Sequence, residues 1–231
     1  MSDGHLVYRV LVAVDIQAYS KLDTREQLNA QRDLTDALDR AARLAGLEPN
    51  RWQRQVGGDG ELSLLPEDID PSVVVGGFTA RLSDELRRIN ARTPGRPRLR
   101  LRVALHHGTL TAGPFGPAGD APIVVQRLLD ATPLRRLLTD DPGRDLALIV
   151  SDSLYEDVVR TGFTSLPQDA FAPIKVTAKG TAFRGYILIG NGPGRGSAQP
   201  PRPGQPLLGT GPRVPSFLER SFLEQSERGQ T

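Results

Sequence analysis

The pattern of apolar and polar positions predicts short strands that alternate with amphipathic helices. Residues 10–14 form an unbroken apolar run, which is typical of a buried strand. Between residues 28 and 44, leucine and alanine recur at helical spacing, and this predicts a helix that ends at Gly46. The segment Thr24-Arg25-Glu26-Gln27 has the shape of a capping box with Thr24 as its cap.

Further elements follow up to about residue 190. Residues 51–56 and 61–65 predict a hairpin that turns at 57–60, and Asp70-Pro71 is expected to start a second helix. Residues 98–103 alternate arginine with an apolar residue, which predicts a half-buried strand. The later expectations are a loop over 113–119, a helix over about 122–138, a strand over 146–150, a short helix capped by Ser151, and two strands over 174–178 and 182–189.

The composition changes at Asn191, so we expect a domain over residues 1–190 and a flexible tail over 191–231. Glycine, proline and serine dominate as far as Pro215, which is typical of a disordered segment. Within the tail, residues 217–223 place apolar side chains at helical spacing. That spacing fits either a transient helix or a segment that docks on a partner.

Composition excludes several classes of protein. The chain has 231 residues, of which 38% are hydrophobic and 24% charged, as expected for a globular domain. Cysteine is absent, so disulfides and thiolate metal sites are excluded. We expect a cytoplasmic protein that does not insert into membranes, because no signal peptide or membrane-length apolar run is seen. Net charge is only +2 and the arginines are dispersed, which favours solvated surface charges over a nucleic-acid interface.

Two aspartates stand where strands are expected to end. Asp15 closes the first apolar run, and Asp59 lies in Gly57-Gly58-Asp59-Gly60 at the expected hairpin turn. Glycine permits backbone geometries and close approaches that other residues forbid. Paired carboxylates with open coordination positions are what Mg²⁺ or Mn²⁺ needs in order to hold substrate phosphates. The pair therefore predicts a nucleotide–metal site, and strand-end capping is the competing interpretation.

Five short segments, in this order, resemble the catalytic domain of class III nucleotidyl cyclases. They are Asp15-Ile16-Gln17-Ala18-Tyr19-Ser20, Gly58-Asp59, the strand segment 102–108 that ends in His-x-Gly, Arg127-Leu128 and Lys179-Gly180. The resemblance spans about residues 7–190. It implies an α+β, ferredoxin-like cyclase homology domain, in which helices flank a central, mostly antiparallel sheet.

The resemblance also implies roles for individual residues. Asp15, Asp59 and the backbone carbonyl of Ile16 would bind two Mn²⁺ or Mg²⁺ ions. Arg127 would stabilise the charge at the α-phosphate, and Lys179 would bind the terminal phosphates, with Lys175 as an alternative. The competing interpretation gives these basic residues surface or structural roles. In the family, the active site forms across a homodimer, with the metals from one subunit and the arginine from the other.

The base-reading positions depart from the purine cyclases of the family. Gln55 and Gly116 stand where those enzymes have Lys and Asp for adenine, or Glu and Cys for guanine, and Ile123 replaces a ribose-orienting asparagine. Gln55 carries both a donor and an acceptor, so it can pair with uracil or cytosine. Arg54 and Trp52 are further candidates for the base site, although Trp52 also fits a place in the core.

With its altered base pocket, the chain resembles the stand-alone pyrimidine cyclases of bacterial antiphage defence, called Pycsar. Their cyclic UMP or cyclic CMP activates a separate effector. The resemblance implies a lyase that converts UTP, or CTP, to the 3′,5′-cyclic monophosphate and pyrophosphate. Two alternatives remain open: an adenylate or guanylate cyclase with an unusual pocket, and a degenerate cyclase fold that only binds nucleotides or partners. His106 and His107 are expected to be structural.

Overall fold

The computed structural model describes residues 5–92, 94–178 and 180–190. Two predictions fall outside these residues, namely the phosphate-binding role of Lys179 and the tail over 191–231. No helix in the described ranges is both long and apolar enough to span a membrane.

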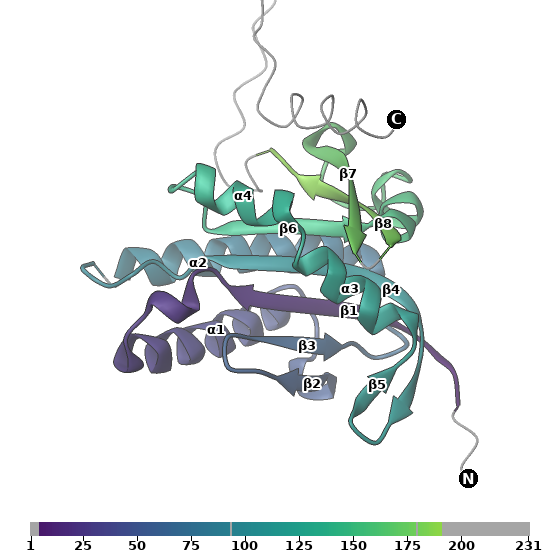
Figure 1. Cartoon of the computed structure of the whole chain (residues 1–231), viewed down its shortest axis with the longest axis horizontal. Helices are drawn as coiled ribbons and strands as arrows, with labels where there is room; N and C mark the ends of the chain where they lie inside the picture. Colours follow the sequence, from purple (N-terminus) through teal and green to yellow (C-terminus); the bar gives the residue numbers. More distant parts are fainter. Residues whose placement is uncertain (1–4, 93, 179, 191–231) are drawn as a thin grey trace, which may run out of the picture. The chain divides into compact units, whose positions relative to one another are not determined.

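The strands of the described residues form one sheet in the order β2-β3-β1-β4-β6-β8-β7, with the short β5 paired to β4 (Figure 1). Within the sheet only β4 and β6 are parallel, which confirms the mostly antiparallel arrangement. The strands are β1 (Val7–Ile16), β2 (Gln53–Val56), β3 (Gly60–Leu64), β4 (Leu101–Gly113), β5 (Gly116–Ala118), β6 (Leu146–Ser151), β7 (Phe171–Ala178) and β8 (Thr181–Leu188).

Helices cover both faces of this sheet, because alternate residues of β1 are buried in two different cores. Val10, Val12 and Val14 contribute to the core that also holds α1 and α2, whereas Leu11 and Ala13 belong to the core with α3 and α4. The helices are α1 (Thr24–Leu44), α2 (Thr79–Arg92), α3 (Asp120–Leu129), α4 (Thr132–Asp140) and α5 (Asp152–Leu154), with π-helical turns at Val73–Phe78 and Tyr155–Val159 and 3₁₀ turns at Tyr19–Lys21, Pro49–Arg51 and Gln168–Ala170.

Three local predictions were wrong in detail. The cap of α1 is Asp23 and not Thr24: the Asp23 carboxylate accepts from the Glu26 N–H at 2.8 Å, and the Glu26 carboxylate accepts from the Asp23 N–H at 2.9 Å. The helix expected over 122–138 is divided into α3 and α4. Pro133, in the first turn of α4, has no N–H and its ring would clash with the carbonyl four residues earlier, so α3 cannot continue through it.

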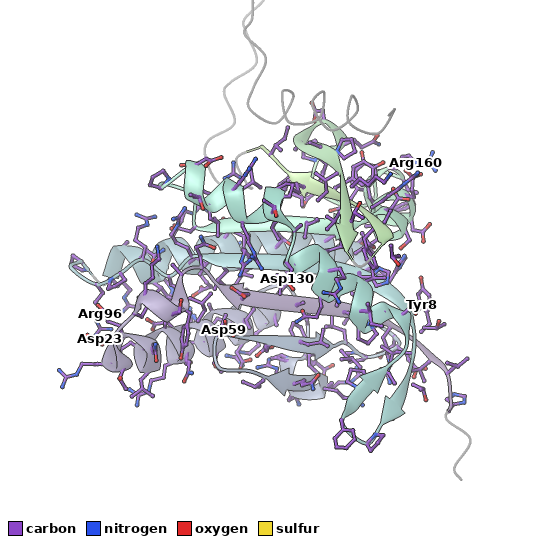
Figure 2. All side chains as sticks on the ribbon, in the orientation of Figure 1. Tyr8, Asp23, Asp59, Arg96, Asp130 and Arg160 are labelled. Atoms are coloured by element: carbon purple, nitrogen blue, oxygen red, sulfur yellow. The ribbon has the colours of Figure 1, made fainter. Side chains whose placement is uncertain are left out.

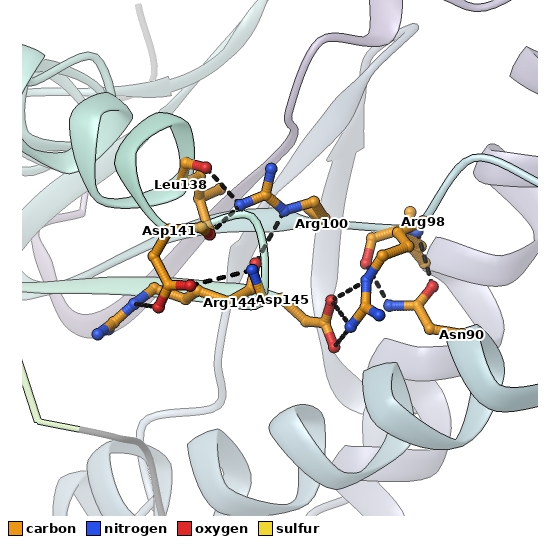
Figure 3. A network of polar contacts seen from close by, with 9 residues as sticks. Asn90, Arg98, Arg100, Leu138, Asp141, Arg144 and Asp145 are labelled. Carbon is orange, nitrogen blue, oxygen red and sulfur yellow. Dashed lines mark hydrogen bonds and ion pairs between the residues drawn. The ribbon is translucent and has the colours of Figure 1, made fainter.

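The strand expected over 98–103 is also different, because β4 begins at Leu101 and its first seven residues are all buried. The arginines that suggested a half-buried strand lie mainly ahead of it. Arg98 pairs with both carboxylate oxygens of Asp145, at 2.7 and 2.8 Å (Figure 3). The guanidinium of Arg100 donates to three backbone carbonyls around the end of α4, those of Leu138, Asp141 and Arg144 (Figure 3).

Arg100 connects this network to the loop that follows β1. Its backbone carbonyl accepts a hydrogen bond from Gln17 N–H at 2.8 Å, two residues after Asp15. The end of α4 and the candidate metal loop are therefore fixed to the same residue.

Candidate active site

The pairing of strands places the two predicted metal ligands side by side. Asp15 pairs with Gly60 of β3 on one side and with Arg102 of β4 on the other. The hairpin tip is held against the end of β1, since Ile16 N–H donates to the Asp59 carbonyl at 2.8 Å. A Cβ on Gly60 would lie 2.0 Å from the Val14 carbonyl oxygen, so this close approach requires glycine.

Helix α1 holds the same tip from its other side. The side-chain amide nitrogen of Gln31 contacts the Gly58 carbonyl and the Tyr19 hydroxyl, both at 2.7 Å. Tyr19 follows Ala18, whose φ of +61° turns the chain sharply after β1. One glutamine thus links the loop after Asp15 to the turn that carries Asp59.

A cleft of about 670 Å³ opens above these aspartates. Its walls come from β1, the β2–β3 hairpin, β5 and α3. It brings together several residues named from the sequence, namely Asp15, Gln55, Asp59, Ile123 and Arg127, and adds Asp130 at the end of α3. Asp59 and Asp130 are labelled in Figure 2.

Asp15 experiences opposing electrostatic effects. Burial raises the pKa of its carboxyl group and is the largest influence. The nearby charges of Asp59 and Asp130 raise the same pKa further, while Arg102 at 2.6 Å lowers it. Concentrated negative charge of this kind favours the binding of a cation.

The donor set fits Mg²⁺ or Mn²⁺ that shares its ligands with a substrate. Among the described residues, no cluster of three or more His, Asp or Glu side chains could enclose a metal ion. Mg²⁺, however, commonly binds through one or two carboxylates together with waters and substrate phosphates. Asp15 and Asp59, with the Ile16 carbonyl beside them, match that requirement.

The two positions that correspond to the base-reading pair are in contact. The Gln55 amide lies against Gly116, where an added Cβ would come 3.1 Å from its Nε2. Gln55 Nε2 also donates to the Phe115 carbonyl, at 3.4 Å. Of Gln55 and Gly116, Gln55 is therefore the residue that presents a polar side chain to the cleft.

Arg127 projects from the last turn of α3 and lines the cleft. Within the described residues it forms no ion pair with Asp15, Asp59 or Asp130. Its guanidinium therefore remains available for an anion. Lys175, the alternative phosphate ligand, is exposed on β7 and does not line the cleft.

The structure does not bring Trp52 and Arg54 to the cleft. Trp52 is buried and packs edge-on against Phe78, with ring centroids 5.6 Å apart. Arg54 pairs with Asp39 of α1 at 2.5 Å, and its guanidinium lies 5.4 Å from the Trp52 ring centroid. Because side chains alternate along a strand, residues 52 and 54 face α1 while Gln55 faces the cleft.

The two histidines of β4 are buried outside the cleft. His106 Nδ1 lies 2.8 Å from the Ser151 hydroxyl, and burial lowers the pKa of His106 to about 4. His107 lies 3.2 Å from Asp157, and burial lowers its pKa as well. His106 thus connects β4 to the end of β6, and His107 connects it to the turn at Tyr155–Val159.

Sequence reasoning missed two charged neighbours of the aspartates, Arg102 and Asp130. Arg102 belonged to a recognised motif, but its position opposite Asp15 depends on the register of β1 and β4. Asp130 depends on how α3 packs across the sheet. No local signal in the sequence reveals either relationship.

Comparisons with known proteins place the fold. No protein-family model and no curated protein sequence matches the chain. Solved structures do match, among them the guanylyl cyclase Cya2, with a TM-score of 0.59 and 13% identity over 82% of this chain and 95% of that one. An adenylate/guanylate cyclase/hydrolase from Silicibacter pomeroyi has a TM-score of 0.59 and 20% identity, over 81% and 99% of the two chains.

A third match is the catalytic core of a rhodopsin-guanylyl cyclase with converted specificity, in complex with ATPαS. Its TM-score is 0.56 and its identity 17%, over 80% of this chain and 98% of that one. Identities at this level establish the fold alone. The chain has the fold of the class III adenylyl and guanylyl cyclase catalytic domains.

Proposed function

We propose that this protein is a nucleotidyl cyclase that converts UTP to its 3′,5′-cyclic monophosphate and pyrophosphate, with CTP as the alternative substrate. The observation that carries the proposal is the cleft, in which Asp15, Asp59, Gln55 and Arg127 meet within a cyclase fold. These residues supply the metal, base and phosphate contacts that the reaction requires.

The proposed chemistry is a displacement at phosphorus. The ribose 3′-hydroxyl loses its proton to water and its oxygen bonds to the α-phosphorus. The bond from that phosphorus to the bridging oxygen breaks, and pyrophosphate departs with the bridging oxygen. Asp15, Asp59 and the Ile16 carbonyl would hold two Mn²⁺ or Mg²⁺ ions, which supply Lewis-acid stabilisation at the 3′-oxygen and the phosphates. Arg127 donates to the α-phosphate oxygens as negative charge builds there. The resemblance assigns the terminal phosphates to Lys179.

The preference for a pyrimidine rests on Gln55 and Gly116. A purine site in this fold uses complementary polar side chains at both positions, whereas here one position has no side chain. A single amide can donate to and accept from one edge of a pyrimidine ring. Uracil presents a carbonyl and an imide N–H on that edge, and we therefore place UTP ahead of CTP.

We further propose that the enzyme works as a homodimer with composite active sites. Three exposed apolar residues lie beside the cleft: Val56 at 72%, Phe115 at 95% and Ile123 at 52% exposure. Exposed apolar side chains at a binding cleft favour an interaction surface. Arg127 is unpaired with the aspartates of its own chain, which supports a role for it at the aspartates of a second copy.

The resemblance to the Pycsar cyclases supports a role for the product as a second messenger. In this proposal the cyclic pyrimidine nucleotide activates a separate effector in antiphage defence. The cyclase itself needs no contact with a membrane or with nucleic acid for that role.

Incubation of the purified protein with Mn²⁺ and each of the four nucleoside triphosphates, with products identified by mass spectrometry, tests the proposal. We expect cyclic UMP, and Asp59→Ala is the matched inactive control. Cyclic AMP or cyclic GMP formed at a comparable rate would refute the pyrimidine assignment. Binding of triphosphates without any product would instead favour a degenerate nucleotide-binding module, with Ile123 at the ribose position as its cause.

A further inference from the structure

Arg102 makes a close charge contact with the first candidate metal ligand. Its Nη2 lies 2.6 Å from Asp15 Oδ1, and the two residues are direct neighbours across β1 and β4. The contact is a short ion pair with a half-buried carboxylate, since 20% of the Asp15 side chain is exposed. Arg102 therefore places a positive charge directly beside Asp15.

Arg102 is held where few other groups can neutralise it. The residue is only 8% exposed, and its Nε and Nη1 atoms are buried without hydrogen-bond partners in the described part of the chain. Unlike Asp15, it does not line the cleft. A buried guanidinium with so few partners is costly unless a negative charge lies beside it.

The two sides of Asp15 differ. Toward β4 its carboxylate contacts Arg102. Toward β3 its partner in the strand register is Gly60, which has no side chain and comes directly after Asp59. The cleft, which Asp15 and Asp59 line and Arg102 does not, is where a metal ion would approach. The positive charges of Arg102 and of the metal would then act on the same carboxylate.

We propose that Arg102 is the built-in counter-charge of Asp15, a positioning residue that stabilises the metal-free fold and weakens the binding of divalent metal. This inference rests on the metal site of the proposed function. Arg102 compensates the half-buried carboxylate before any metal arrives, so the fold does not depend on metal. Arg102 and the metal ion carry like charges that would lie a short distance apart in partly buried surroundings. The arginine therefore lowers the affinity of the site for the cation.

Metal binding and thermal unfolding of the full chain test this role together. Mn²⁺ affinity is measured by calorimetry at mildly alkaline pH, where carboxylates are ionised. We expect Arg102→Met to bind Mn²⁺ about tenfold more tightly than the wild type, equivalent to about 1.4 kcal/mol. Arg102→Lys, which retains the charge, should stay close to the wild type.

The stability measurement needs no metal. Arg102→Met should lower the melting temperature by roughly 6 °C or more, because it leaves a half-buried carboxylate unpaired. The same change in an Asp15→Asn background should cost much less, and added Mn²⁺ should restore more stability to Arg102→Met than to the wild type. Arg98→Met is the matched control, since it also removes a short arginine–aspartate pair but lies at Asp145. It should lose stability while keeping wild-type Mn²⁺ affinity.

The possible results distinguish a failure of the counter-charge role of Arg102 from a failure of the proposed cyclase activity. Equal or weaker Mn²⁺ binding by Arg102→Met overturns the counter-charge role, as does the absence of coupling to Asp15 in the metal-free protein. If neither the wild type nor Arg102→Met binds Mn²⁺, the metal site and this inference both fail. If Mn²⁺ binds as expected but no triphosphate is cyclised, the proposed activity fails and the inference stands.

Discussion

The side-chain amide of Gln55 occupies the space beside Gly116 that a side chain on residue 116 would need. A Cβ built on Gly116 would lie 3.1 Å from Gln55 Nε2 and 3.3 Å from Oε1. Gly116 also has a φ of +122°, a conformation that L residues rarely adopt. The position of the Gln55 amide therefore depends on residue 116, because the absence of a side chain there leaves room for the amide.

We expect Gly116→Ala to lower kcat/KM for the proposed pyrimidine triphosphate by roughly tenfold or more, because the new methyl group displaces the amide that we propose to pair with the base. Steady-state kinetics with UTP and CTP measures this. Gly162→Ala is a suitable control, since Gly162 has a φ of +79° but no neighbour within 4 Å of an added Cβ. It carries the same kind of backbone strain and should keep its kcat/KM. An unchanged kcat/KM in Gly116→Ala would remove Gln55 from the base site.

Gly60→Ala should destabilise the fold by about 3 kcal/mol or more, as expected for severe overpacking against backbone. The cause is the Val14 carbonyl oxygen, 2.0 Å from the added Cβ. Gly58→Ala, two residues earlier, meets nothing within 4 Å and should unfold close to the wild type. Urea unfolding of the two variants makes the comparison. Similar stabilities would show that the hairpin tip can move away from β1, and that it does not fix the distance between the aspartates.

Sequence patterns predicted the parts of the site that depend on local signals. The hairpin around Asp59 and the strand before Asp15 were predicted because glycine clusters and apolar runs report on a few neighbouring residues. The pairing of Asp15 with Arg102 was not predicted, because residues 87 positions apart meet only through strand register. Trp52 and Arg54 were grouped with Gln55 by proximity in the sequence, although strand alternation turns them to the other face. The division of the helix at Pro133 could have been predicted from the sequence, since a proline inside a helical pattern marks a break.

Acid should destabilise the protein through His106. Burial lowers the pKa of His106 to about 4 from an ordinary 6.5, so between these values the unfolded chain binds a proton that the folded chain excludes. Stability is therefore retained above pH 6.5 and lost as the pH falls toward 4, by up to about 3 kcal/mol. His107, whose pKa burial also lowers, acts in the same direction.

Urea midpoints measured across this range for the wild type and His106→Asn test that effect. The asparagine amide can replace the contact with Ser151 but does not titrate, so the variant should show a shallower loss of stability in acid. Carboxylates contribute equally to both proteins and cancel in the comparison. Parallel curves would mean that His106 gains its proton without cost in the folded state.

Mixing two inactive variants distinguishes a composite site from a site within one chain. Asp59→Ala removes a proposed metal ligand and Arg127→Ala removes the proposed phosphate contact, and each should abolish turnover while leaving the fold intact. If Arg127 acts on the aspartates of a second copy, a mixed dimer contains one complete site and one that lacks both residues. Random association should then restore about a quarter of wild-type activity, since half of the dimers are mixed and each has one of two sites. Arg127 also lines the cleft of its own chain with Asp15 and Asp59, so the mixing experiment decides which pair of aspartates it serves. No recovery on mixing, with dimers confirmed by sedimentation, would assign Arg127 to the aspartates of its own chain.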